Sequence, residues 1–142
     1  MKLYFLILTD TELSYDNYSE DFAIGFFDSM DKAEKTAEYY LNNVTGFCKF
    51  PCTYRIIEKN LIGSEKNLKG IYIVQGWNIN ENLDEVDIIE SQCFASECDA
   101  LSELEIMKEK YPRDEWAFNY WTIGETEWKE GFCRWCNGEW AD

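Results

Sequence analysis

The stretch LYFLIL at residues 3–8 returns as IYIV at residues 71–74, and this recurrence decides the fold. The residues FDS at 27–29 return in the same way as FAS at 94–96. Around each stretch the pattern runs as an apolar strand, a polar loop, a second strand, a helix and a third strand. Such self-similarity indicates a duplicated supersecondary unit, and two copies must pack on each other to close one core.

The first copy contains the clearest helix signal in the chain. Residues 3–8 and 22–27 are apolar runs typical of strands. Asp28 or Ser29 can cap the helix that follows, and Gly46 is expected to end it. A third strand is predicted at residues 54–57, with Leu61 and Ile62 beyond it. Apolar helix positions recur at three- and four-residue steps, at Met30, Ala33, Ala37, Tyr40, Leu41 and Val44.

The second copy repeats this plan with changed details. Strands are predicted at residues 71–74, 86–90 and 116–121, with a loop at 77–85 between the first two. Ser96, followed three residues later by Asp99, resembles a capping box at the start of the helix. The helix is expected to stop before Pro112. Its apolar positions Ala100, Leu104, Met107 and Tyr111 are displaced from Ala33, Ala37, Tyr40 and Val44 by one constant interval.

These elements predict an α+β fold. Two tandem ββαβ units are expected to form one antiparallel or mixed sheet of about six strands with two helices and pseudo-twofold symmetry. A chain of 142 residues suits a single compact domain over residues 1–142. Within it we expect copy one at 1–63, a linker at 64–69, copy two at 70–132 and an aromatic and acidic tail at 133–142.

The charge restricts the possible partners. Acidic residues outnumber basic ones by 28 to 13, so the net charge is −15. This charge repels nucleic-acid phosphates and anionic lipids and attracts basic proteins, although many soluble proteins are acidic for solubility alone. No segment approaches the roughly 20 apolar residues of a membrane span, and residues 3–8 are too few for a secretory signal. We therefore expect a cytoplasmic protein that binds neither nucleic acid nor membrane.

Several reaction classes are disfavoured by composition. The chain has no histidine, which argues against hydrolase triads, most catalytic zinc sites and a histidine general base. Neither a P-loop nor a Gly-x-Gly-x-x-Gly fingerprint is present, so no cofactor is expected. Carboxylate-only chemistry stays open, but among 28 acidic residues no pair is preferred. The sequence favours a protein that is not an enzyme.

The six cysteines are expected to be free thiols in a cytoplasmic protein. Cys133 and Cys136 nevertheless have the spacing of a zinc knuckle. Cys48 and Cys52 could complete a four-thiolate zinc site if the ends of the two copies met. The repeat gives no reason for this convergence, so zinc is an alternative to buried or surface thiols.

Five of the six tryptophans lie at or after residue 116. Trp116 and Trp121 fall in a predicted strand and are expected in the core. Trp128, Trp135 and Trp140 follow in a segment rich in Glu and Gly. Because Trp is enriched at binding hot spots, we predict that these three residues bind a partner. Alternatively, the tail folds back and covers a face or an edge of the sheet.

The Tyr-containing first strand, the Ser-capped helix and the dipeptide Gly46-Phe47 precede an ending, WKEGF at residues 128–132. This pattern resembles a group of small uncharacterised bacterial proteins that have one ββαβ unit and a Trp-x-Glu-Gly-Phe ending, here duplicated in tandem. The first copy lacks that ending. The resemblance implies a fold and no catalytic residues.

The sequence predicts an acidic protein-binding module. This prediction combines the negative net charge, the lack of recognisable catalytic motifs and the many aromatic residues near the end of the chain. The module would occupy a basic site on another protein, as an immunity protein of a bacterial toxin or a phage-encoded inhibitor does. The alternative is a small-ligand or zinc-binding module at the junction of the two copies, since concave sites are common at such junctions.

Overall fold

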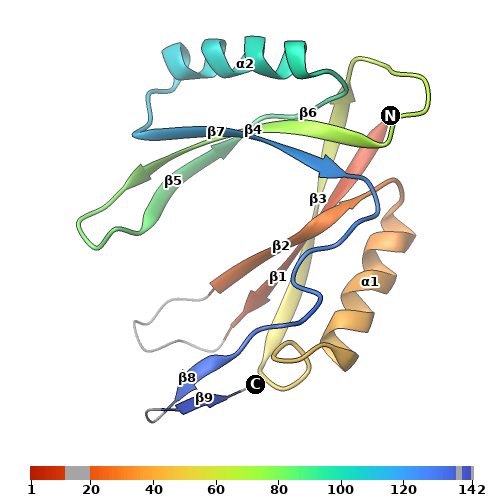
Figure 1. Ribbon diagram of the computed structural model, residues 1–142, viewed down its shortest axis with the longest axis vertical. Coiled ribbons are helices and arrows are strands. Elements are labelled where there is room, and N and C mark those ends of the chain that lie inside the picture. The colour runs from red at the N-terminus through yellow and green to blue at the C-terminus, as the bar shows by residue number, and fades with distance from the viewer. Residues whose placement is uncertain (12–19, 137–138, 142) are drawn as a thin grey trace. The chain divides into compact units, whose positions relative to one another are not determined.

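The computed structural model describes residues 1–11, 20–136 and 139–141 (Figure 1). They form an α+β fold with two helices and a mixed sheet. In chain order the elements are β1 (Lys2–Asp10), β2 (Glu20–Phe27), α1 (Met30–Asn43), β3 (Cys52–Ile62), β4 (Gly70–Ile79), β5 (Glu85–Glu90), β6 (Cys93–Phe94), α2 (Glu97–Lys110), β7 (Glu115–Thr122), β8 (Arg134–Cys136) and β9 (Glu139–Ala141).

The chain divides into two compact units. The N-terminal unit holds residues 2–58 and 124–142, and the central unit holds Met1 and residues 59–123. Strand β3 passes from the N-terminal unit into the central one. Each unit contains one helix packed against strands of the same unit.

In the N-terminal unit the strand order is β2-β1-β3, and β1 pairs antiparallel with β2. Helix α1 begins at Ser29, whose Oγ accepts a hydrogen bond from the Lys32 N–H at 3.2 Å. The helix packs its apolar stripe against β1 and β2. The buried cluster beneath this helix contains Leu6, Leu8, Phe22, Ile24, Phe27, Ala33, Ala37, Tyr40, Val44, Phe47 and Phe132.

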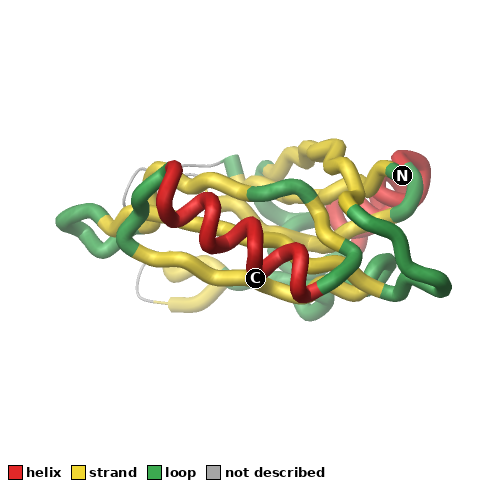
Figure 2. Tube along the Cα trace, turned by 90° about the horizontal axis from the view of Figure 1, so that it is seen from above, coloured by secondary structure: helices red, strands yellow, loops and turns green. Residues whose placement is uncertain are grey.

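In the central unit, β4 is the middle strand. Strand β7 runs antiparallel along one edge of β4, and β5 and β6 also pair with it. Strand β6 pairs in parallel with the end of β3, which makes the sheet mixed. Helix α2, capped at Ser96, lies across the strands of this unit (Figure 2). One buried cluster here contains Val74, Phe94, Ala100 and Met107, with Trp116 packed against it. Ile71, Ile73 and Cys93 are buried in the same unit.

The structure corrects several predicted boundaries. Residues 77–79, predicted as loop, continue β4, because Trp77 pairs with Glu115 and Asn78 with Val86. Helix α1 ends at Asn43, before Gly46, and β3 is one strand over Cys52–Ile62. Strands β6, β8 and β9 were not anticipated. Both halves contain the order ββαβ apart from β6, while the duplication and its pseudo-twofold symmetry remain predictions.

Candidate functional site

Residues 124–132, which we call the strap, pack on the N-terminal unit. The Gly124 N–H donates to the Phe26 carbonyl at 2.8 Å, and the Glu127 N–H donates to the Ile24 carbonyl at 2.8 Å. At the other end, the Phe132 N–H donates to the Thr45 carbonyl at 3.0 Å. The strap therefore lies along β2 and reaches the turn after α1.

Two glycines make this close approach possible. A Cβ at Gly25 would collide with the backbone carbonyl of Glu125. Gly131 has a φ of 79°, and a Cβ there would collide with the Thr45 carbonyl. Only glycine combines a positive φ with such a close backbone contact at low cost. The glycine of the Trp-x-Glu-Gly-Phe ending is therefore required by packing.

The phenylalanine of the same ending belongs to the core of the N-terminal unit. Phe132 is 8% exposed and stacks on Phe22, with ring centroids 4.7 Å apart. It also meets Phe47 edge to face at 4.9 Å. The ending of the predicted second copy thus completes the core of the N-terminal unit, which contains most of the predicted first copy.

Trp128 is the tryptophan that the strap presents to solvent. Its side chain is 45% exposed, and its ring meets Phe22 edge to face at 4.8 Å. Its φ is 59°, which is rare for a bulky residue. The Gly131 N–H closes this turn on the Trp128 carbonyl at 2.9 Å. One of the three tryptophans predicted to bind a partner is thus half exposed on a packed support.

The other two predicted tryptophans lie on the hairpin of β8 and β9. Trp135 and Trp140 are partners in the antiparallel register of this hairpin. Their side chains lie outside the described residues, so their part in binding stays a prediction. Sequence reasoning did not anticipate the hairpin because its strands are only three residues long.

A groove of about 600 Å³ separates α1 from the strap. Lys35, Tyr39 and Tyr40 line its helix side, while Lys129 and Glu130 line its strap side. The Tyr40 hydroxyl donates to the Glu127 carbonyl at 2.8 Å, and burial raises the pKa of Tyr40. Lys35 is bound to Asp31 at 2.9 Å, and this hydrogen bond raises the pKa of Lys35. Tyr40 therefore fixes the strap to the helix.

The cysteines differ in exposure. Cys48 and Cys133 are exposed and Cys52 is half buried. Cys136 has its side chain outside the described residues. Within the described part of the chain, no group of three or more Cys, Asp or Glu side chains is placed to hold a metal ion. The described residues therefore do not support the alternative of a four-thiolate zinc site, while the side chain of Cys136 lies outside them.

Cys93 is fully buried in the central unit, beside a buried lysine. Lys59 donates to the Ser91 carbonyl at 3.1 Å and lies 3.8 Å from a carboxylate oxygen of Glu90. Burial raises the pKa of the Cys93 thiol to about 12, although the charge of Lys59 opposes this. A thiol held protonated in this way is a poor nucleophile.

We expect Cys93 to give stability a specific dependence on pH. Its pKa rises from 9.0 in the unfolded chain to about 12 in the folded one, so only the unfolded chain loses the proton in between. Stability should therefore be insensitive to this group below about pH 9 and fall as pH rises from 9 to 12. Denaturant unfolding at several pH values should show a steeper decline for the wild type than for Cys93→Ala.

Alkylation of the native protein checks the same environment. Iodoacetamide at pH 8 should label the exposed Cys48, Cys98 and Cys133 and leave Cys93 unmodified, as read by mass spectrometry. Labelling of Cys93 as fast as the exposed thiols would contradict its burial.

No helix among the described residues is long and apolar enough to cross a membrane. Comparison of the chain with protein-family models, with curated proteins and with solved structures finds no match.

Proposed function

We propose that this protein is a non-enzymatic acidic module that binds a basic site on another protein, as antagonists and immunity-type proteins do. The proposal rests on the exposed and well-supported side chain of Trp128. Its ring rests on Phe22 while 45% of the side chain stays exposed, on a backbone of positive φ. Strained backbone that the surroundings maintain is concentrated at functional sites.

The support beneath Trp128 favours binding. The strap is tied to β2 and to the turn after α1 by backbone hydrogen bonds, and Tyr40 holds it from the helix. A side chain that is already ordered loses less entropy when a partner covers it. Tryptophan on such a support is the residue type most often found to dominate binding energy.

The charge around Trp128 indicates the sign of the partner. Glu125, Glu127 and Glu130 are exposed on the strap, against a single Lys129. With a net charge of −15 on the whole chain, this surface attracts a basic protein and accelerates its association.

Affinity capture from a lysate of the source organism tests the proposal. The wild type should retain a basic protein, and Trp128→Ala should weaken that binding by about 2 kcal/mol, or roughly 30-fold. Tyr111→Ala is the control, because Tyr111 is 43% exposed but belongs to the central unit. A triple variant that adds Trp135→Ala and Trp140→Ala extends the test to the hairpin.

Two further measurements make this test decisive. Binding should weaken as salt rises from 0.05 to 0.5 M, because exposed charges are screened. Thermal unfolding of Trp128→Ala should show only the modest loss of about 1 kcal/mol that the removal of one aromatic contact costs. Equal loss of binding in Trp128→Ala and Tyr111→Ala, or recovery of no basic partner in repeated captures, would overturn the proposal.

A further inference from the structure

The central unit has an open cavity of about 670 Å³ that contains no residue of the strap. The turn at residues 63–69 between β3 and β4 forms one side, and the start of α2 forms another. Tyr72 from β4 and Tyr120 from β7 complete the wall. The cavity is therefore built from four separate segments of one unit.

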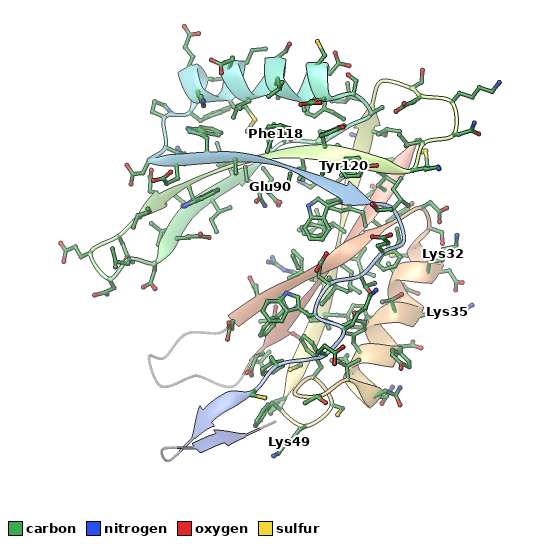
Figure 3. The ribbon with its side chains drawn as sticks, in the orientation of Figure 1. Lys32, Lys35, Lys49, Glu90, Phe118 and Tyr120 are labelled. Atoms are coloured by element: carbon green, nitrogen blue, oxygen red, sulfur yellow. The ribbon has the colours of Figure 1, made fainter. Side chains whose placement is uncertain are left out.

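Two tyrosine rings give the cavity an aromatic wall. Tyr72 and Tyr120 are partners in the β4–β7 register, and their ring centroids lie 5.0 Å apart. Tyr120 is 52% exposed, and Figure 3 shows it on β7. Gly70 makes room for this ring, because a Cβ at Gly70 would collide with the Tyr120 hydroxyl. The backbone of β4 thus holds Tyr120 against the cavity.

Carboxylates outnumber cations in the same wall. Glu65, Glu97 and Asp99 line the cavity, together with one cation, Lys69. The ion pairs found among the described residues include none of these four side chains. The cavity lining therefore carries more negative than positive charge, which favours a ligand of positive charge.

The start of α2 does not make this an anion site. The N-terminal end of a helix carries a partial positive charge, but Glu97 and Asp99 stand in the first turn and oppose it. The Asp99 N–H is already bound to the Ser96 hydroxyl at 3.2 Å. A phosphate or carboxylate ligand would therefore face more negative than positive charge.

We propose that this cavity binds an organic cation that bears a guanidinium or ammonium group. The tyrosine rings supply π faces for the cation, and the carboxylates accept its N–H hydrogen bonds. The ligand can be a free amine or an arginine or lysine side chain of a protein, since both present the same chemical group. This site is independent of the Trp128 surface, so either proposal can fail alone.

Isothermal titration of the full chain at 0.05 M salt tests the proposal with three probes. Agmatine represents the free cation, a capped peptide with one arginine between glycines represents the protein-borne group, and N-acetylaspartate is the anionic control. We expect saturable binding of at least one cationic probe and none of the anion. Preference for agmatine indicates a small-molecule ligand, and preference for the peptide indicates a protein side chain.

Matched variants separate a specific site from general charge attraction. Glu97→Gln combined with Asp99→Asn should weaken binding about tenfold, and Tyr120→Leu should weaken it about fivefold, whereas Tyr120→Phe keeps the ring and most of the affinity. Glu109→Gln, on the exposed part of the same helix, is the control and should bind normally. Circular dichroism confirms that each variant is folded. Absence of saturable binding by both cationic probes, or equal weakening in Glu109→Gln, would overturn the proposal.

Discussion

Replacing Phe132 by alanine should lower the free energy of unfolding by about 3–5 kcal/mol, the usual cost of removing a buried phenylalanine. Phe132 is 8% exposed and contacts Phe22 and Phe47, so its loss opens a cavity in the core of the N-terminal unit. Denaturant unfolding measures the effect as a lower midpoint concentration, with an unchanged dependence of the unfolding free energy on denaturant concentration.

Trp128→Ala is the matched control for this change. Trp128 lies on the same strap and touches the same Phe22, but nearly half of its side chain is already in solvent. Its removal should cost only about 1 kcal/mol, the value of one aromatic contact. Equal destabilisation by the two variants, or a Phe132→Ala protein as stable as the wild type, would show that the strap is not part of the core.

Gly131→Ala is expected to have the second large effect. Alanine at a φ of 79° costs about 1–2 kcal/mol, because its Cβ crowds the backbone. The same Cβ would also push the Thr45 carbonyl away from its hydrogen bond with Phe132, at a further cost of about 1–3 kcal/mol. The melting temperature should therefore fall sharply.

Gly124→Ala separates strain from crowding in this experiment. Gly124 has a φ of 86°, but a Cβ there would meet no atom within 4 Å. Gly124→Ala should therefore lower the free energy of unfolding only by the conformational cost of about 1–2 kcal/mol. If both glycine variants lose the same free energy of unfolding, crowding of the Thr45 carbonyl does not add to the destabilisation by Gly131→Ala.

These two results bear directly on the binding proposal. Trp128 stands between the hydrogen bond of Glu127 to Ile24 and the buried Phe132. A strap that loosens would release Trp128 from Phe22 and lose its ordered surface. Gly131→Ala should therefore reduce partner binding as well as stability, whereas Tyr111→Ala should reduce neither.

The local signals in the sequence were sufficient for the helix starts and the first strands. Ser29, one of the two predicted candidates, and Ser96 cap their helices, because a cap depends only on a side chain and a backbone N–H three residues away. The apolar run at residues 3–8 lies within β1, since continuous apolar residues mark a buried strand. The predicted partner-binding role of Trp128 stays a prediction, and the structure adds that its side chain is 45% exposed.

Sequence reasoning failed where pairing partners lie far apart in the chain. The extension of β4 through Trp77 depends on Glu115, and the two residues of β6 depend on the end of β3. Neither segment carries a periodic pattern long enough to be read alone. The predicted loop at 77–85 was wrong for its first residues for this reason.

The sequence by itself determined the elements whose stability is local: the capped helices, the apolar strands, the acidic surface and the absence of histidine chemistry. Only the tertiary structure decided where the strap goes and which residues surround the cavity of the central unit. The backbone of Glu125 packs closely against Gly25, and the ring of Tyr120 contacts that of Tyr72. The residues of each pair lie in separate segments of the chain, and no periodic pattern in the sequence indicates that they meet. Such contacts form because whole surfaces are buried together, and that burial is a property of the folded chain.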